Sequence, residues 1–186
     1  MKFCQLLMLF FLLSVPVWAA ELPVLEGLIE PNESVEFSSQ VPGIIEQMNV
    51  ERGDLVRRGY VVAKLKSGVE EAAVNLARAR VDFGLRKAER NEELYKKKLI
   101  SIHEKDEIET EIQLAQLELM ETQERLKLRT ILSTTDGLVV ERTGAPGEYV
   151  GEEPFLTIAR INPLNVEVVV PVAYYGAIKK GQFALV

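Results

Sequence analysis

Few residues in this chain have the type and spacing that catalysis or metal binding requires. His103 is the only histidine, and Glu107 lies four residues further along a predicted helix, so the two side chains share one face. Two ligands on a charged helix surface are fewer than a zinc site uses. The only cysteine is Cys4, near the start of the chain. We therefore predict that the protein is not an enzyme and has no metal site and no cofactor.

The strongest sequence pattern is a repeat. Residues 41–62 and 135–156 match each other at a constant offset of 94 positions. Each copy contains an apolar strand, a turn with glycine beside an acid, and a second apolar strand. Its matched glycines, which we expect at the turns of the two halves, are Gly43 with Gly137 and Gly53 with Gly147. The repeat predicts two similar β halves.

A pair of helices is predicted between the two copies. Ser67 with Glu70, and Ser101 with Glu104, have the spacing of capping boxes, in which each serine accepts a backbone N–H bond and the glutamate reaches back to the serine N–H. Each helix has roughly 30 residues, so the antiparallel pair is expected to project roughly 40 to 45 Å.

The spacing of apolar residues predicts which faces of the two helices pack against each other. In the second helix, side chains alternate spacings of four and three, as in a coiled coil: Ile108, Ile112, Ala115, Leu119, Thr122 and Leu126. The expected partner face of the first helix is less regular: Val69, Ala72, Ala73, Leu76, Ala79, Phe83 and Leu94. We predict an antiparallel coiled coil, and Gly84 is the only weak point in the helix-forming composition of its first helix.

The N-terminal segment has the pattern of a secretory signal peptide, with a charge at Lys2, an apolar run and small residues before a cleavage site at Ala19 or Ala20. A mature chain without cysteine favours the bacterial periplasm. The net charge of −6 argues against nucleic acid as a partner.

Five segments are expected along the chain. They are a signal peptide at 1–20, N-terminal strands with the first β half at 21–66, a helical hairpin at 67–129, the second half at 130–162, and the start of another β domain at 163–186. A turn at 30–33 is expected to separate two short N-terminal strands. Residues 162–165 are expected to interrupt the chain before a strand at 166–172, a helical turn at 173–178 and a last strand from Gly181.

Together these motifs resemble periplasmic adaptor subunits, or membrane fusion proteins, of tripartite bacterial efflux pumps (the HlyD-like family, RND-type adaptors). The segments that carry the resemblance are 41–45, 52–59, 130–131 and 136–139. It implies an α+β fold: a split lipoyl/biotinyl-like β domain with an inserted antiparallel coiled-coil α-hairpin, followed by the start of a β-barrel domain. Lys66 departs from the acidic residue that the family commonly shows.

The resemblance also implies partners. Such adaptors bridge an inner-membrane transporter and a TolC-like outer-membrane channel to export small molecules, and they act as a homo-oligomeric ring, here expected to pack around the turns at 52–54 and 146–148. Arg90, Leu94 and Ser101 have the spacing Arg-x3-Leu-x6-Ser, which is similar to the tip pattern that engages the channel. These three residues are therefore the expected docking site.

Two alternatives fit the same resemblance. An adaptor of a type I protein secretion system has a similar hairpin and half-motifs but usually keeps a membrane anchor, so retention of Lys2 in the mature protein would favour it. A lipoyl or biotinyl carrier would need a modified lysine on an exposed β-turn, and Lys66 is the candidate. The intact mass of the mature chain distinguishes a carrier from an adaptor.

Overall fold

The computed structural model describes residues 24–184. The predicted signal peptide therefore lies outside the described residues. The chain forms one compact unit from residues 30–165, and a second unit that includes residues 24–29 and 166–184. The elements, in order, are β1 (Gly27–Phe37), β2 (Gly43–Met48), β3 (Leu55–Val56), β4 (Val61–Leu65), α2 (Gly68–Lys96), α3 (Ile102–Lys127), β5 (Thr130–Leu132), β6 (Gly137–Arg142), β7 (Tyr149–Val150), β8 (Leu156–Val168) and the 3-10 helix η2 (Val172–Tyr174).

Two four-stranded sheets form the β part, in the orders β5-β4-β2-β7 and β1-β8-β6-β3. Each half of the repeat pairs its first strand with the other half's second strand. Gly43 of β2 lies opposite Val150 of β7, and Gly137 of β6 lies opposite Val56 of β3, both in antiparallel register. The two halves are therefore interlocked and cannot fold as separate modules.

Both halves contribute to one hydrophobic core. Ile45 and the matching Val139 are fully buried, and Val62, Leu65 and Ile158 pack in the same cluster. Alternation along the short strands places these side chains inward. The core confirms the predicted split β domain.

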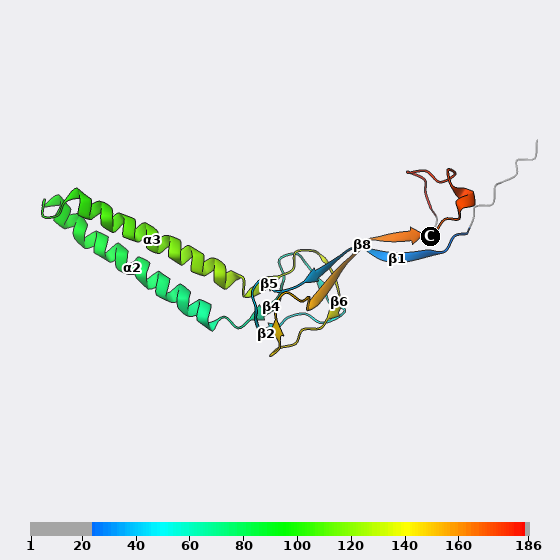
Figure 1. Ribbon diagram of the computed structural model, residues 1–186, viewed down its shortest axis with the longest axis horizontal. Helices are drawn as coiled ribbons and strands as arrows, with labels where there is room; N and C mark the ends of the chain where they lie inside the picture. The colour runs from blue at the N-terminus through cyan, green and yellow to red at the C-terminus, as the bar shows by residue number, and fades with distance from the viewer. Residues whose placement is uncertain (1–23, 185–186) are drawn as a thin grey trace, which may run out of the picture. The chain divides into compact units, whose positions relative to one another are not determined.

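The inserted hairpin consists of α2, with 29 residues, and α3, with 26 residues. Figure 1 shows the two helices side by side, extending away from strands β2, β4 and β5 of the same unit. At about 1.5 Å per residue, α2 is roughly 43 Å long. The predicted antiparallel hairpin is confirmed.

The strands at the two ends differ from the prediction. One continuous strand, β1, replaces the two short strands that were expected around residues 30–33. β1 lies at the edge of its sheet, and an edge strand tolerates a proline such as Pro31 that a central strand would exclude. The sequence suggested a turn only because it does not show which strands lie at an edge.

Strand β8 also passes through the expected interruption at 162–165. Its register with β6 covers Leu156 to Ala159, so beyond that point Pro163 lies in a stretch that pairs with β1 alone. A proline is tolerated where one side of a strand is open. The expected strand from Gly181 is also wrong, since residues 181–184 are not in a strand.

Candidate functional site

The two turns of the repeat have the same geometry. Gly53 and Gly147 have φ angles of +99° and +94°, in the left-handed region that glycine adopts readily. Each donates its N–H across to the other half, to Val139 O and Ile45 O respectively, at 2.8 Å in both cases. An acidic side chain closes each turn, since Asp54 accepts from Glu51 N–H and Glu148 from Ala145 N–H, both at 2.8 Å.

Gly43 and Gly137 are not turn residues, contrary to expectation. They are the first residues of β2 and β6. A Cβ at Gly137 would lie 2.5 Å from the carbonyl oxygen of Ala159, and one at Gly43 would lie 2.5 Å from Nη1 of Arg129. Close approach, rather than a positive φ angle, is the reason for glycine at these two positions.

One further matched pair, which was not predicted, is Ser39 and Ser133. Ser39 Oγ donates to Val41 O at 2.5 Å, and Ser133 Oγ donates to Thr135 O at 2.6 Å. Both serines are buried. They lie at the same offset as the glycines, two residues before each copy was taken to begin, so extending the alignment would have found them.

The seam between the helices is as predicted on α3, but on α2 only Ala73 and Leu94 of the expected residues are half-buried. The six α3 residues are buried or half-buried, with Ile108 and Ile112 the most enclosed. On α2 the side chains of Val69, Leu76 and Phe83 are instead 80%, 58% and 59% exposed. The buried residues of α2 are Val74, Ala77 and Val81.

Gly84 explains this difference. A Cβ at Gly84 would lie 2.9 Å from Cγ1 of Ile112, so the two backbones approach closely at this position. A seam through the small residues Ala77 and Gly84 admits Ile112, whereas a seam through Phe83 would hold the helices further apart. The expected weak point of the first helix is therefore a place where the two helices approach each other closely.

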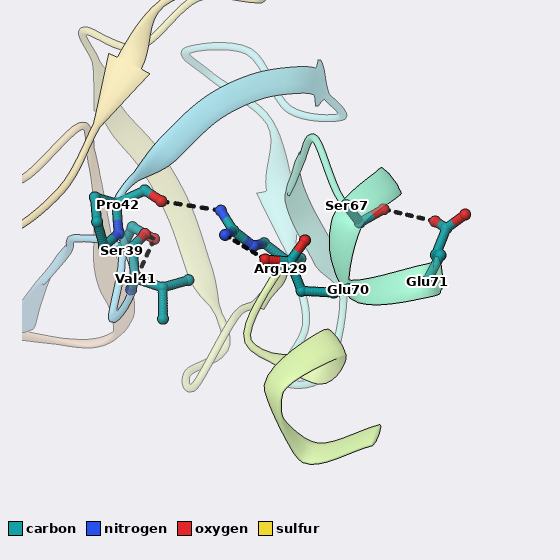
Figure 2. Close-up of polar contacts among 7 residues, drawn as sticks. All are labelled: Ser39, Val41, Pro42, Ser67, Glu70, Glu71 and Arg129. Carbon is teal, nitrogen blue, oxygen red and sulfur yellow. Dashed lines mark hydrogen bonds and ion pairs between the residues drawn. The ribbon is translucent and has the colours of Figure 1, made fainter. Parts of the chain in front are cut away.

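Arg129 joins three segments at the base of the hairpin (Figure 2). It follows the end of α3. Its Nη1 donates to Pro42 O at 2.9 Å, and its Nη2 donates to Oε1 of Glu70 at 2.5 Å. The side chains of Arg129 and Glu70 are only 20% and 18% exposed. The guanidinium group thus ties both helices to the segment that enters β2.

The charge of Glu70 is stabilised at this position. Burial favours the neutral form and raises its pKa, but backbone hydrogen bonding and the hydrogen bond and positive charge of Arg129 outweigh burial. The net result is a pKa of Glu70 below the usual value of 4.5. The Glu70–Arg129 pair is therefore ionised at neutral pH.

The capping box predicted at Ser67 is wrong. Ser67 makes no cap bond with its side chain, and its Oγ instead donates to Oε1 of Glu71 at 2.6 Å (Figure 2). Glu70, which was expected to reach back to Ser67, is bound to Arg129 instead. A hydrogen bond between two charged groups is stronger than one to a backbone N–H, so Glu70 turns toward the hairpin base.

The capping box predicted at Ser101 is present. Ser101 Oγ accepts from Glu104 N–H at 3.2 Å, and Oε2 of Glu104 accepts from Ser101 N–H at 2.9 Å. The preceding turn contains Lys98 with a φ angle of 59°, an uncommon conformation for a residue other than glycine. This cap starts α3 directly at the tip.

A cross-helix pair lies behind the tip. Lys105 Nζ is 3.2 Å from Oε2 of Glu92 and 4.9 Å from the centre of the Tyr95 ring. The hydrogen bond and opposite charge of the partner lower the pKa of Glu92 and raise that of Lys105. Both groups are charged across the physiological range, and they link the ends of α2 and α3.

The three expected docking residues lie at this end of the hairpin. Arg90 is exposed, Leu94 is half-buried, and both lie on α2, while Ser101 caps α3. Arg90 and Leu94 share one helix face because they are four residues apart. Leu99 and Ile102, which were not among the expected docking residues, are also exposed, at 68% and 56%.

The described part of the chain forms neither a carrier-type lysine turn nor a metal site. Lys66 lies two residues before the start of α2, and its backbone N–H donates to Ile44 O at 2.9 Å, so it is not on the β-turn that a carrier lysine needs. Within residues 24–184, no three His, Cys, Asp or Glu side chains gather where they could hold a metal ion. In the same range, no helix is long and apolar enough to cross a bilayer.

Two interlocked β halves around a shared core, with a helical hairpin inserted between them, define a barrel-sandwich hybrid domain with an α-hairpin. The chain belongs to the family described as CzcB-like, barrel-sandwich hybrid domain, which matches residues 33–159. An uncharacterized protein of Haemophilus influenzae is 29% identical over 134 residues, covering 67% of this chain and 35% of that protein.

Solved structures share the fold. A putative efflux transporter from Bacteroides eggerthii has a TM-score of 0.64 at 21% identity, covering 82% of this chain and 48% of that one. A MacA-MexA chimeric protein with the Pseudomonas aeruginosa MexA α-hairpin domain has a TM-score of 0.65 at 19% identity, covering 74% and 51%. Structures of a membrane fusion protein and a periplasmic adaptor protein also share it, which confirms the fold that the resemblance implied.

These relatives are longer than the chain. It spans about a third of the Haemophilus protein and about half of each of the two compared structures.

Proposed function

We propose that the protein is a periplasmic adaptor of a tripartite efflux pump. It bridges an inner-membrane transporter and an outer-membrane channel, so that small molecules leave the cell without entering the periplasm. The observation that carries this proposal is the hairpin, a paired rod roughly 43 Å long that is fixed at its base by Arg129. A rod with a fixed base and an exposed tip is suited to span the distance between two partner proteins.

The role requires no catalysis, because the transporter supplies the energy. The signal pattern in residues 1–20 supports export to the periplasm, followed by cleavage. A ring of copies is part of the proposal, because one hairpin cannot enclose a conduit. The structural neighbours whose names refer to efflux and to the MexA hairpin support the assignment by fold.

The tip is the proposed channel-docking surface. Arg90 offers a planar set of donors for carbonyl or carboxylate groups, Leu94 is a partly covered apolar group, and Ser101 is a small polar residue beside the turn. Exposed Leu99 and Ile102 add apolar surface at the same end. A few such anchors carry most of the energy of an interface.

Cross-linking in cells tests the proposal directly. A cysteine at Leu99, in a Cys4→Ser background, would be linked to its neighbours and the captured protein identified. We expect an outer-membrane channel. The control places the cysteine at exposed Gln116 on the shaft of α3, where the channel should not be captured. Capture of a cytosolic enzyme, or no difference from the control, would reject the adaptor role.

Arg90→Asp tests the residue assignment. A carboxylate in place of the guanidinium removes the donors and reverses the charge, so capture from Leu99 should fall by about tenfold or more. Arg78→Asp, also on the exposed surface of α2 but nearer the base, should leave capture unchanged. Equal capture by both variants would remove Arg90 from the docking surface.

A further inference from the structure

The turn at the tip of the hairpin ends α2 with a Schellman motif. The N–H of Leu99 donates to Leu94 O at 2.9 Å, and the N–H of Lys98 donates to Tyr95 O at 2.8 Å. These two bonds satisfy carbonyl groups that the end of the helix leaves without a partner. The motif requires a left-handed residue directly after the helix cap, Lys97, and that residue is Lys98, with a φ angle of 59°.

A lysine at this position is unfavourable for the fold. In the left-handed region the Cβ of an ordinary residue lies too close to a carbonyl oxygen, so glycine usually occupies this place in the motif. Within residues 24–184, Lys98 is the only residue other than glycine with a positive φ angle. Backbone strain of this kind is concentrated at functional sites. The fold alone would be more stable with glycine in place of Lys98.

The side chain of Lys98 is exposed, and interactions within the protein do not account for it. It is the last of three consecutive lysines. Lys96 lies 3.7 Å from Glu92 and Lys97 lies 4.0 Å from Glu93. No ion pair among the described residues includes Lys98. Because Lys96 and Lys97 already supply the positive charge that the C-terminal end of a helix favours, the ammonium group of Lys98 is not needed for that purpose.

Lys98 lies at the apex of the hairpin, beside the proposed docking surface. Figure 1 shows the turn between α2 and α3 at the end of the hairpin that is farthest from the strands of the same unit. Leu99 and Ile102, which follow Lys98, are 68% and 56% exposed. The tip is also basic, since residues 90–105 carry five lysine and arginine side chains and three glutamates in a chain with a net charge of −6. The apex therefore presents a cation beside exposed apolar groups.

We propose that Lys98, in its left-handed conformation at the apex, forms an ion pair with a carboxylate on the end of the outer-membrane channel. The inference rests on the proposed function and adds to it a fourth docking residue and the chemistry of the surface that receives it. A carboxylate of a protein fits the apex better than the phosphates of a lipid surface. A membrane-binding element needs a broad apolar face with several cations, whereas a few apolar groups beside a charge are typical of a protein interface.

Glycine in place of Lys98 relieves the strain and removes the ammonium group in one step. In the purified full-length chain, we expect Lys98→Gly to unfold at a temperature about 2 to 4 °C higher than Lys98→Ala, which keeps the Cβ. Lys97 has a φ angle of −82°, so at that position alanine should be the more stable replacement. Helical circular dichroism during heating gives these temperatures. An unfolding temperature of Lys98→Gly at or below that of Lys98→Ala would overturn the proposal.

Capture of the channel in cells measures the ion pair itself. The cross-linking cysteine replaces exposed His103 in the Cys4→Ser background, near the tip but outside the proposed docking surface. Lys98→Gly should reduce capture by about tenfold, because a hydrogen bond to a charged group is lost, whereas Lys98→Arg should retain it. Lys97→Ala is the matched control, and removal of this neighbouring lysine should change capture by less than about twofold. A variant that is more stable and yet captures less cannot owe its defect to misfolding.

Failure of the inference is distinguishable from failure of the proposed function. If Lys98→Gly captured the channel as well as the chain that retains Lys98, the ion pair would be rejected while the adaptor role would stand. If the chain that retains Lys98 captured no channel, the proposed function would fail and the inference with it.

Vesicles of phosphatidylglycerol and phosphatidylcholine test the lipid alternative. We expect the purified full-length chain not to sediment with them, because the apex has too little apolar surface to bind a bilayer. Sedimentation with these vesicles that Lys98→Gly abolishes would assign Lys98 to lipid phosphates and overturn the carboxylate partner.

Discussion

Gly53 and Gly137 illustrate two different reasons for glycine in the repeat. Gly53 has a φ angle of +99° and no atom within 4 Å of the place that a Cβ would occupy, so only its backbone conformation excludes other residues. Gly137 has space for no Cβ at all, because the carbonyl oxygen of Ala159 and Cγ2 of Ile158 would lie 2.5 and 2.9 Å from it. The sequence marks both glycines as equivalent members of one repeat.

Alanine substitutions distinguish these reasons. Gly53→Ala should lower the free energy of unfolding by about 1 kcal/mol, the cost of a left-handed residue with a Cβ. Gly137→Ala should cost more, about 2 to 3 kcal/mol, because the backbone of β8 must move. Urea unfolding of the two variants measures the difference. An equal cost, or a larger cost at Gly53, would contradict the close approach at Gly137.

The Arg129–Glu70 pair gives a prediction for pH. Since the pKa of Glu70 is lowered in the folded protein, the pair contributes stability above pH 4.5 and loses it as the pH falls through that lowered pKa. Arg129→Met should lower the free energy of unfolding by about 1 to 2 kcal/mol at pH 7. The difference from the unsubstituted protein should shrink below pH 4.5.

Arg125→Met is the control for this prediction. The Arg125–Glu121 pair is on the surface, with side chains 70% and 61% exposed, so its loss should cost less than about 0.5 kcal/mol. Chemical unfolding at a series of pH values measures both variants. The account of the hairpin base would be wrong if Arg129→Met and Arg125→Met had the same effect at every pH.

At the scale of the elements, the two helices of the hairpin start in different ways. The sequence predicts the same capping box at Ser67 and Ser101, but only Ser101 forms one. Local spacing could not reveal that Glu70 has a competing partner, because Arg129 lies far away in the sequence. The α2 seam was missed for a similar reason, since the close approach at Gly84 depends on Ile112 of the other helix.

Serine substitutions test the two helix starts. Ser101→Ala removes a real cap and should cost about 1 kcal/mol. Ser67→Ala removes only an exposed bond to Glu71 and should cost less than about 0.5 kcal/mol. Thermal unfolding followed by helical circular dichroism provides the comparison. A larger effect at Ser67 would mean that α2 is capped as the sequence predicted.

At the scale of the molecule, the repeat in the sequence predicts both the interlocked halves and the inserted hairpin. The halves could be predicted because a single constant offset relates the two sets of strands. The hairpin could be predicted because its charged segment has a cap residue and a regular α3 seam, which together form a strong helical pattern. The end strands were less predictable. Whether Pro31 or Pro163 interrupts a strand depends on which of its sides is paired, and that is decided by distant residues.

The reach of the hairpin is the central claim, and a shortened hairpin tests it. Deleting residues 77–83 from α2 and 115–121 from α3 removes one heptad from each helix, preserves the phase of the seam, and retains Arg90, Leu94 and Ser101. The rod becomes roughly 10 Å shorter. A full-length Phe83→Ala, Leu117→Ala variant is the control, because it loses two exposed apolar side chains of the deleted segments without losing length.

The decisive measurement is the yield of outer-membrane channel captured in cells by a cysteine at Leu99 in these two chains, with helical circular dichroism confirming that both hairpins are folded. The account predicts that the full-length control captures the channel and that the shortened chain does not. Capture by a folded, shortened hairpin at the yield of the control would contradict the proposal that this rod spans the distance between the partners.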